Sequence, residues 1–94
     1  MSVGLRFGFS QLTLGDYDKV CEALNFPSDW PQGLQAQASY EIDGRLVLSE
    51  VWASRQQFDS FVEQRLQSAM GQALGDRAEQ PEVTEHELHT FYTS

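Results

Sequence analysis

The chain begins with a short segment in which apolar and polar positions alternate. Between residues 3 and 9 every second side chain is large and apolar, and the positions between them hold glycine or arginine. This period of two is typical of a β-strand. From Leu14 to Leu24 the apolar positions follow a helical period instead, with Thr13 placed to cap a helix and Asp16 in its first turn. The pattern therefore predicts a strand followed by a helix.

The middle of the chain has the pattern of a β-hairpin. Between residues 34 and 52, two alternating runs flank an Asp-Gly dipeptide. Asp-Gly favours a type I′ turn, which needs positive φ at both central positions. The register that follows from this turn places Gln37 opposite Glu50 and Gln35 opposite Trp52.

A second helix and a last strand complete the chain. Ser54 followed by Gln57 predicts a capping box, and apolar residues then recur at helical spacing from Phe58 to Leu74. Residues 82–92 alternate weakly and predict a final strand. The resulting order is βαββαβ.

This order predicts one ferredoxin-like α+β domain over residues 1–94, with a four-stranded antiparallel sheet and two helices on one face. One face of the hairpin is mostly apolar, and we expect it to lie under the helices. It carries Ala36, Ala38, Tyr40, Val47 and Val51. The opposite face mixes apolar and polar side chains, which suits a self-complementary interface or a ligand pocket. It is expected to carry Arg6, Gln35, Gln37, Ser39, Leu46, Leu48, Glu50 and Trp52.

Charge and cysteine content exclude several classes of function. The 94 residues carry a formal net charge of -8, and the six basic residues are scattered, so nucleic acid is not an expected partner. The N-terminal segment has no signal-peptide apolar core and no stretch is long enough to span a membrane, so a cytoplasmic protein without a membrane partner is expected. With a single cysteine, Cys21, no internal disulfide or multi-cysteine metal site is expected.

Four features spanning nearly the whole chain resemble the dimeric α/β-barrel superfamily, which contains the antibiotic-biosynthesis-monooxygenase-like proteins. They are the strand end Glu50-Val51-Trp52, the helix start at Ser54, the Phe58/Phe61 pair and the final strand with His89. The resemblance implies a homodimer in which two sheets join face to face with the helices outside. It also implies that a ligand occupies a cavity between sheet and helices or inside the barrel.

The haem-degrading chemistry of that superfamily is not expected here. Those members use an asparagine on the first strand and a tryptophan and a histidine in the second helix. This chain has Asn25 as its only asparagine, Phe61 at the tryptophan position and Gly71 near the histidine position. We therefore expect no cofactor and no metal.

Two residues are candidate catalytic bases and four are candidate ligand contacts. The candidate bases are Glu50 and His89, and the candidate contacts are Arg6, Gln37, Leu48 and Trp52. A partly buried carboxylate can accept a substrate proton when burial raises its pKa, and Arg6 is expected beside Glu50 on the same face. The structural alternatives are an ion pair or dimer contact for Glu50, packing for Trp52 and a local hydrogen bond for His89.

Three functions remain open at this point. The first is a homodimer that binds a small aromatic or apolar molecule in its cavity. The second is a cofactor-independent monooxygenase with a quinol-type substrate, or an isomerase, acting in the same cavity. The third is a structural dimer with no ligand.

Overall fold

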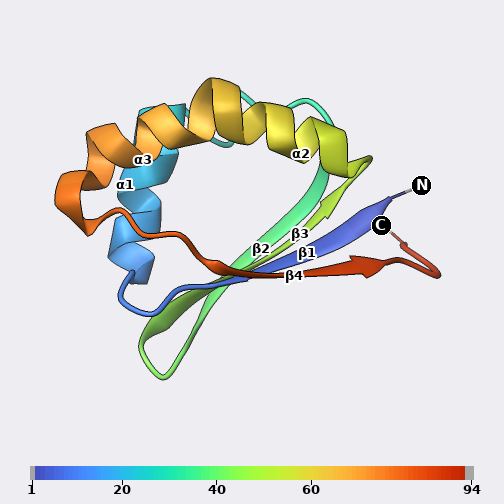
Figure 1. The fold of residues 1–94 in the computed structure, drawn as a ribbon, viewed down its shortest axis with the longest axis horizontal. Coiled ribbons are helices and arrows are strands. Elements are labelled where there is room, and N and C mark those ends of the chain that lie inside the picture. Colours follow the sequence, from blue (N-terminus) through green and yellow to red (C-terminus); the bar gives the residue numbers. More distant parts are fainter. Residues whose placement is uncertain (1, 93–94) are drawn as a thin grey trace.

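The computed structural model describes residues 2–92, which form one sheet covered on one side by helices (Figure 1). The elements are β1 (Val3–Gly8), α1 (Leu14–Leu24), β2 (Leu34–Ile42), β3 (Arg45–Trp52), α2 (Arg55–Phe61), a π-helical turn (Val62–Leu66), α3 (Gln67–Leu74), a 3-10 turn (Gly75–Arg77) and β4 (Glu82–Glu87). The four strands are antiparallel neighbours in the order β2-β3-β1-β4. This arrangement confirms the predicted ferredoxin-like fold.

Both predicted helix starts are capped as the sequence indicates. The Thr13 hydroxyl accepts a hydrogen bond from the Asp16 backbone N–H, and the Asp16 carboxylate accepts one from the Thr13 backbone N–H in return. Ser54 accepts from the backbone N–H of Gln57 in the same way. Each cap satisfies backbone donors that the first turn of a helix leaves unpaired. None of the helices in residues 2–92 is both long and apolar enough to cross a membrane.

The hairpin turn and most of its register are as predicted. Asp43 and Gly44 have φ values of 53° and 77°, as a type I′ turn requires. Gln37 lies opposite Glu50, but a bulge between Leu34 and Ala36 shifts the end of the strand. Leu34, and not Gln35, therefore lies opposite Trp52. The prediction was wrong there because one extra residue in a bulge cannot be read from alternation alone.

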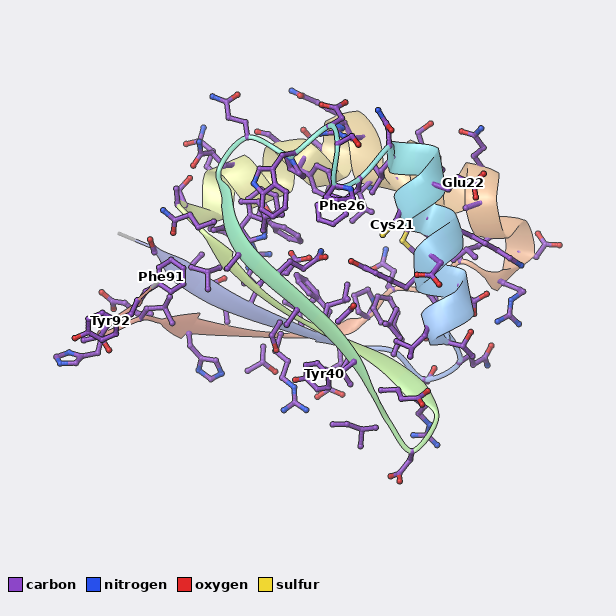
Figure 2. All side chains as sticks on the ribbon, turned by 180° about the vertical axis from the view of Figure 1, so that it is seen from behind. Cys21, Glu22, Phe26, Tyr40, Phe91 and Tyr92 are labelled. Atoms are coloured by element: carbon purple, nitrogen blue, oxygen red, sulfur yellow. The ribbon has the colours of Figure 1, made fainter. Side chains whose placement is uncertain are left out.

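The two faces of the sheet are reversed relative to the prediction. The side chains under the helices are the bulky ones of β1 and β3, together with the polar pair that lies beside them. They are Leu5, Phe7, Gln37, Leu46, Leu48, Glu50 and Trp52. The small and β-branched set lies on the outer face, where Figure 2 shows Tyr40 pointing away from the helices. That set is Ala36, Ala38, Tyr40, Val47 and Val51.

Side-chain volume explains the reversal. A helix layer about 10 Å above a sheet must be met by long side chains, and alanines leave that space empty. Trp52 is 0% exposed and Leu5 is 2% exposed, whereas Ala38 on the other face is exposed. The number of apolar residues on a hairpin face is thus a weaker guide than their combined volume.

Arg6 does not lie beside Glu50. In the register of β1 with β3, Leu5 is opposite Glu50 and Arg6 is opposite Ser49, so the Arg6 side chain is exposed on the outer face. Because side chains alternate strictly along a strand, Arg6 and Glu50 are on opposite sides of the sheet.

The segment before β4 is fastened to the β1–α1 loop by one carboxylate. Glu79 accepts hydrogen bonds from the backbone N–H groups of Ser10, Gln11 and Leu12 and from the Ser10 hydroxyl. Partial burial opposes the charge, but the hydrogen bonds from Gln11, Ser10 and Leu12 outweigh it, so the pKa of Glu79 is lowered. This contact joins parts of the chain more than 60 residues apart, and charge patterning along the sequence gave no signal for it.

The second helix and the last strand differ from their predicted forms. The predicted single helix is divided by the π-helical turn Val62–Leu66, in which the Gln67 backbone N–H reaches back to the Val62 carbonyl. β4 ends at Glu87 and not at Tyr92. Phe91 and Tyr92 follow it as exposed side chains beyond the strand (Figure 2).

We expect Asp16→Asn to lower the free energy of unfolding by about 1–2 kcal/mol at pH 7. Asp16 is buried, and its pKa is lowered first by the Arg77 guanidinium, 2.6 Å away, and then by the Thr13 backbone N–H. A lowered folded-state pKa contributes stability that is present above the unfolded value of about 3.9 and is lost as the pH falls through the folded value. The cost of the substitution should therefore shrink in acid.

Urea denaturation at pH 7 and pH 3.5 measures this effect, with Asp18→Asn as the control. Asp18 is exposed on the same helix, so its replacement should change stability little at either pH. A cost for Asp16→Asn that is equal at both pH values would contradict the proposed ion pair.

Candidate functional site

A cavity of about 950 Å³ lies between the sheet and the helices. Its floor is formed by β1, β2 and β3, one wall by α1, and its roof by α2, the π-helical turn and α3. The lining side chains are mainly apolar, with a minority of polar and charged ones. This volume falls at the upper end of the range of roughly 300–1,000 Å³ that small-molecule sites occupy.

The polar group at the floor of the cavity is the Glu50 carboxylate. Its Oε2 accepts a hydrogen bond of 2.7 Å from the Gln37 side-chain amide, and its Oε1 accepts one of 2.8 Å from the Trp52 indole N–H. The Tyr17 hydroxyl donates to the Gln37 carbonyl oxygen, so the network extends from β3 through β2 to α1. The three strand residues can meet because β2 and β3 place Gln37 and Glu50 in direct register.

Every donor that contacts Glu50 is uncharged. Glu50 is 8% exposed, and within residues 2–92 its carboxylate forms no salt bridge with a lysine, arginine or histidine. Burial is the largest influence and raises the pKa of Glu50, while the hydrogen bonds from Trp52 and Gln37 oppose the rise without cancelling it. Glu50 is thus a carboxylate whose charge the fold stabilises only in part, which is the condition of a carboxyl group able to take up a proton.

Tyr17 and Cys21 border the cavity from α1 one helical turn apart. Figure 2 shows the Cys21 side chain on the side of α1 that faces the sheet. Burial raises the pKa of the Tyr17 hydroxyl, and the neighbouring Cys21 thiol raises it further. Burial likewise raises the pKa of the Cys21 thiol. Both groups therefore remain neutral hydrogen-bond donors at physiological pH and not nucleophiles.

Aromatic rings enclose the end of the cavity next to Trp52. The Trp52 ring contacts Phe58 edge to face at 5.5 Å between centroids and contacts Phe61 at the same distance, and Phe7 lies 5.3 Å from Phe58. The capped start of α2 brings Phe58 and Phe61 over the sheet, because residues three apart on a helix share a face. The site thus combines one carboxylate with several aromatic faces.

The only basic residue in the cavity lining is Arg55, and it is engaged elsewhere. Its guanidinium pairs with Asp59 at 3.0 Å and with Glu85 on β4, and its carbon atom lies 5.5 Å from the Phe58 ring centroid. These contacts hold Arg55 at the rim. No group of three His, Cys, Asp or Glu residues within the described range could hold a metal ion.

The structure brings together four of the six candidate site residues. Gln37, Leu48, Glu50 and Trp52 all line the cavity, although it lies under the helices and not on the face where we expected the mixed side chains. Arg6 lies on the other face of the sheet. His89 is exposed and lies two residues beyond the end of β4, away from the cavity lining.

Two features of the site were missed from the sequence. Tyr17 falls on the apolar stripe of the first helix, and its spacing gives no sign that its hydroxyl reaches Gln37. The π-helical turn also has no sequence signature of its own, yet Phe61, Val62 and Leu66 line the cavity at this turn. Such wide turns are frequent at functional sites.

The fold is shared with several solved structures. Rv0793 from Mycobacterium tuberculosis is 18% identical, with a TM-score of 0.71 and coverage of 99% of this chain and 100% of that chain. A protein of Chloroflexus aurantiacus provisionally assigned as an antibiotic biosynthesis monooxygenase is 17% identical, with a TM-score of 0.69 and coverage of 99% and 98%. SnoaB from Streptomyces nogalater, a cofactor-independent oxygenase, is 12% identical, with a TM-score of 0.62 and coverage of 99% and 96%.

These similarities establish that the chain has the fold of the antibiotic-biosynthesis-monooxygenase-like proteins, as its sequence features indicate. No protein-family profile matches the sequence. No curated protein matches it significantly either.

Glu50→Gln has one advantage and one cost for the ligand-free protein. It removes a buried charge that has no cationic partner. It also places an amide NH2 against a donor, either the Gln37 amide or the Trp52 indole N–H, at a cost of about 1–3 kcal/mol that does not depend on pH. A raised folded-state pKa contributes stability that is complete below the unfolded value of about 4.3 and is lost as the pH rises through the folded value. The advantage of the variant should therefore grow between pH 4 and pH 7.

Thermal or urea denaturation at the two pH values tests this expectation. Glu41→Gln is the matched control, since Glu41 is an exposed residue of the same hairpin. If the difference in unfolding free energy between Glu50→Gln and the wild type is the same at both pH values, the carboxylate is better stabilised in the fold than its neutral neighbours indicate.

Proposed function

We propose that the protein is a homodimer that binds a small aromatic molecule in the cavity between sheet and helices, with Glu50 as the group that contacts the polar end of the ligand. The observation that carries this proposal is a partly buried carboxylate held by neutral donors at the floor of a cavity walled by aromatic rings. A flat ligand would lie against Phe58 and Phe61, whose rings pack on the fully buried Trp52. Leu48 and Gln37 would border its polar end.

The size of the cavity favours a ligand over the third function, a dimer without one. A cavity of about 950 Å³, partly open to solvent, leaves apolar side chains of this 94-residue chain without packing partners if no molecule occupies it. Small domains have little stability to spare. A bound molecule would restore the missing contacts.

The proposed dimer would form through the outer face of the sheet. That face combines small side chains with exposed apolar ones: Tyr40 is 38% and Ile42 is 46% exposed, and glycines at positions 4 and 8 add no side-chain bulk. The helices cover only the opposite face, so in a single chain this surface is open to water (Figure 1). Two such sheets packed face to face would bury it and leave the helices outside.

Cofactor-independent oxygenation is a second candidate, supported by the carboxylate and by the shared fold with SnoaB. A quinol bound with a hydroxyl against Glu50 would lose its proton to the carboxylate, which would raise the electron density of the ring. Molecular oxygen would then add at a ring C–H position. One oxygen atom would remain on the ring as it becomes a hydroxyquinone, and the other would leave as water, so the quinol itself supplies the electrons.

Native mass spectrometry of the protein as purified, without denaturant, should give a dimer carrying a reproducible extra mass. That mass should be absent from a Trp52→Ala variant, because the largest ring in the cavity wall is then missing. Oxygen uptake with a panel of quinols separates the two candidates. Turnover that falls at least tenfold in Glu50→Gln and not in Glu41→Gln would favour the oxygenase, and ligand retention without turnover would favour binding alone.

We expect Ala38→Glu to convert the dimer to a monomer, as measured by light scattering after size-exclusion chromatography. The substitution puts a carboxylate on the open face, and the two-fold arrangement would bring two such charges close together. Ser68→Glu adds the same charge to an exposed position of α3 and should leave the dimer intact. A dimer that survives Ala38→Glu would place the interface elsewhere.

A further inference from the structure

Negatively charged side chains outnumber positively charged ones around the cavity. Its lining includes five carboxylates and one guanidinium, and neither lysine nor histidine is among the lining residues. The charged residues are Asp16, Glu50, Asp59, Glu63 and Glu79, with Arg55 as the single cation. The chain as a whole carries a formal net charge of -8. An anionic ligand would enter this field at a cost.

Most of these carboxylates are already compensated, and Glu50 is the exception. Asp16 pairs with Arg77, Asp59 pairs with Arg55, and Glu79 accepts three backbone N–H groups. Glu63 is exposed to water. Glu50 is 8% exposed and has only the uncharged donors of Gln37 and Trp52. A buried charge is normally paired, so the missing partner at this position needs an explanation.

Arginine side chains that would balance this charge are held away from Glu50. Arg55 is committed to Asp59 and Glu85 at the rim, and Arg65 binds the Leu24 and Asp29 carbonyls outside the cavity. Arg6 projects from the other side of the sheet. Neutralising Glu50 therefore requires either a proton or a cation on a bound molecule, since no cation in residues 2–92 pairs with it.

The aromatic walls next to Glu50 suit the same kind of ligand. The centroid of the Trp52 ring lies 5.5 Å from the ring centroids of Phe58 and of Phe61, and all three residues line the cavity. Ring faces attract an ammonium group and also pack against a flat hydrocarbon. A carboxylate combined with aromatic faces is thus complementary to an aromatic amine at both of its ends.

We propose that the ligand of this cavity is an aromatic amine in its ammonium form, with the charged nitrogen paired to Glu50 and the ring against Phe58 and Phe61, which pack on the buried Trp52 ring. The inference rests on the proposed ligand site and specifies its chemistry. The ammonium group would use the remaining lone pairs of the two Glu50 oxygens, since each oxygen accepts one protein hydrogen bond. Charge-assisted hydrogen bonds of this kind are stronger than neutral ones.

Three probes that share a naphthalene ring and differ in charge test the inference. They are 2-naphthylmethylamine, 2-naphthalenemethanol and 2-naphthoate, each measured by isothermal titration calorimetry at pH 7 in 150 mM salt. The ammonium probe should bind the wild type at least roughly tenfold more tightly than the alcohol, and the carboxylate most weakly. In Glu50→Gln the ammonium probe should lose roughly tenfold, while the alcohol should change by less than about threefold.

Glu63→Gln is the matched control, because it removes an equal charge from the rim of the same cavity. It should keep the preference for the ammonium probe, whereas an equal loss in both variants would show a general field effect and overturn the inference. If the alcohol binds the wild type as tightly as the amine, the charge preference is wrong but the ligand site stands. If no probe binds at millimolar concentration, both the inference and the proposed binding function fail.

Discussion

The alternation of side chains along β3 is the constraint on which the rest of the structure depends. Leu46, Leu48, Glu50 and Trp52 point under the helices, and Val47, Ser49 and Val51 point away. β3 lies between β2 and β1, so its parity sets the parity of both neighbours through the hydrogen-bonded register. One strand thereby decides which side chains fill the core, which line the cavity and which remain on the open face.

Glu50 shows how a polar residue is accommodated within this scheme. At its position an apolar side chain would extend the core by one more residue. Instead, the fold places an amide from β2 and an indole from the same strand against the two carboxylate oxygens. Those contacts leave no buried side-chain polar atom without a partner in the described part of the chain. The charge itself, however, is balanced by no neighbouring cation, and this combination gives the cavity its chemical character.

Much of the fold could be predicted from the sequence because its signals are local. The alternation of residues 3–9, the caps at Thr13 and Ser54 and the Asp-Gly turn each depend on a few adjacent residues, and all are confirmed by the structure. The bulge near Leu34 lies instead at the start of β2, where the Gly33 carbonyl accepts a hydrogen bond from the Ala53 backbone N–H, from a part of the chain beyond β3. The early end of β4 depends on where β1 stops offering a partner. Neither the bulge nor the end of β4 can therefore be predicted from the residues of that strand alone.

The site could be predicted only in part, for the same reason. Hairpin register alone was enough to unite Gln37 and Glu50, and alternation added Leu48 and Trp52. The side of the sheet on which they lie depends on the volume that the helices require, which the residues of the hairpin do not specify. Tyr17 joins the network from α1 because of the distance at which that helix packs on the sheet, and no sequence pattern encodes this distance. The prediction for Arg6 assumed that it shares a face with Glu50, but it lies opposite Ser49. The prediction for His89 assumed that the last strand extends past it, but β4 ends at Glu87.

The π-helical turn Val62–Leu66 is a position where a change in chain length would alter the cavity wall without altering the rest of the fold. A helix advances by about 100° per residue, and a π-helical turn accommodates one residue more than the α-helical period. Loss of one residue between Phe61 and Gln67 would restore a regular helix and leave both ends of the element in place. The side chains before and after the turn would keep their positions, and only those of the turn itself would move. A single-codon deletion could thus change the side chains that this turn places over the cavity, while the sheet beneath them stayed unchanged.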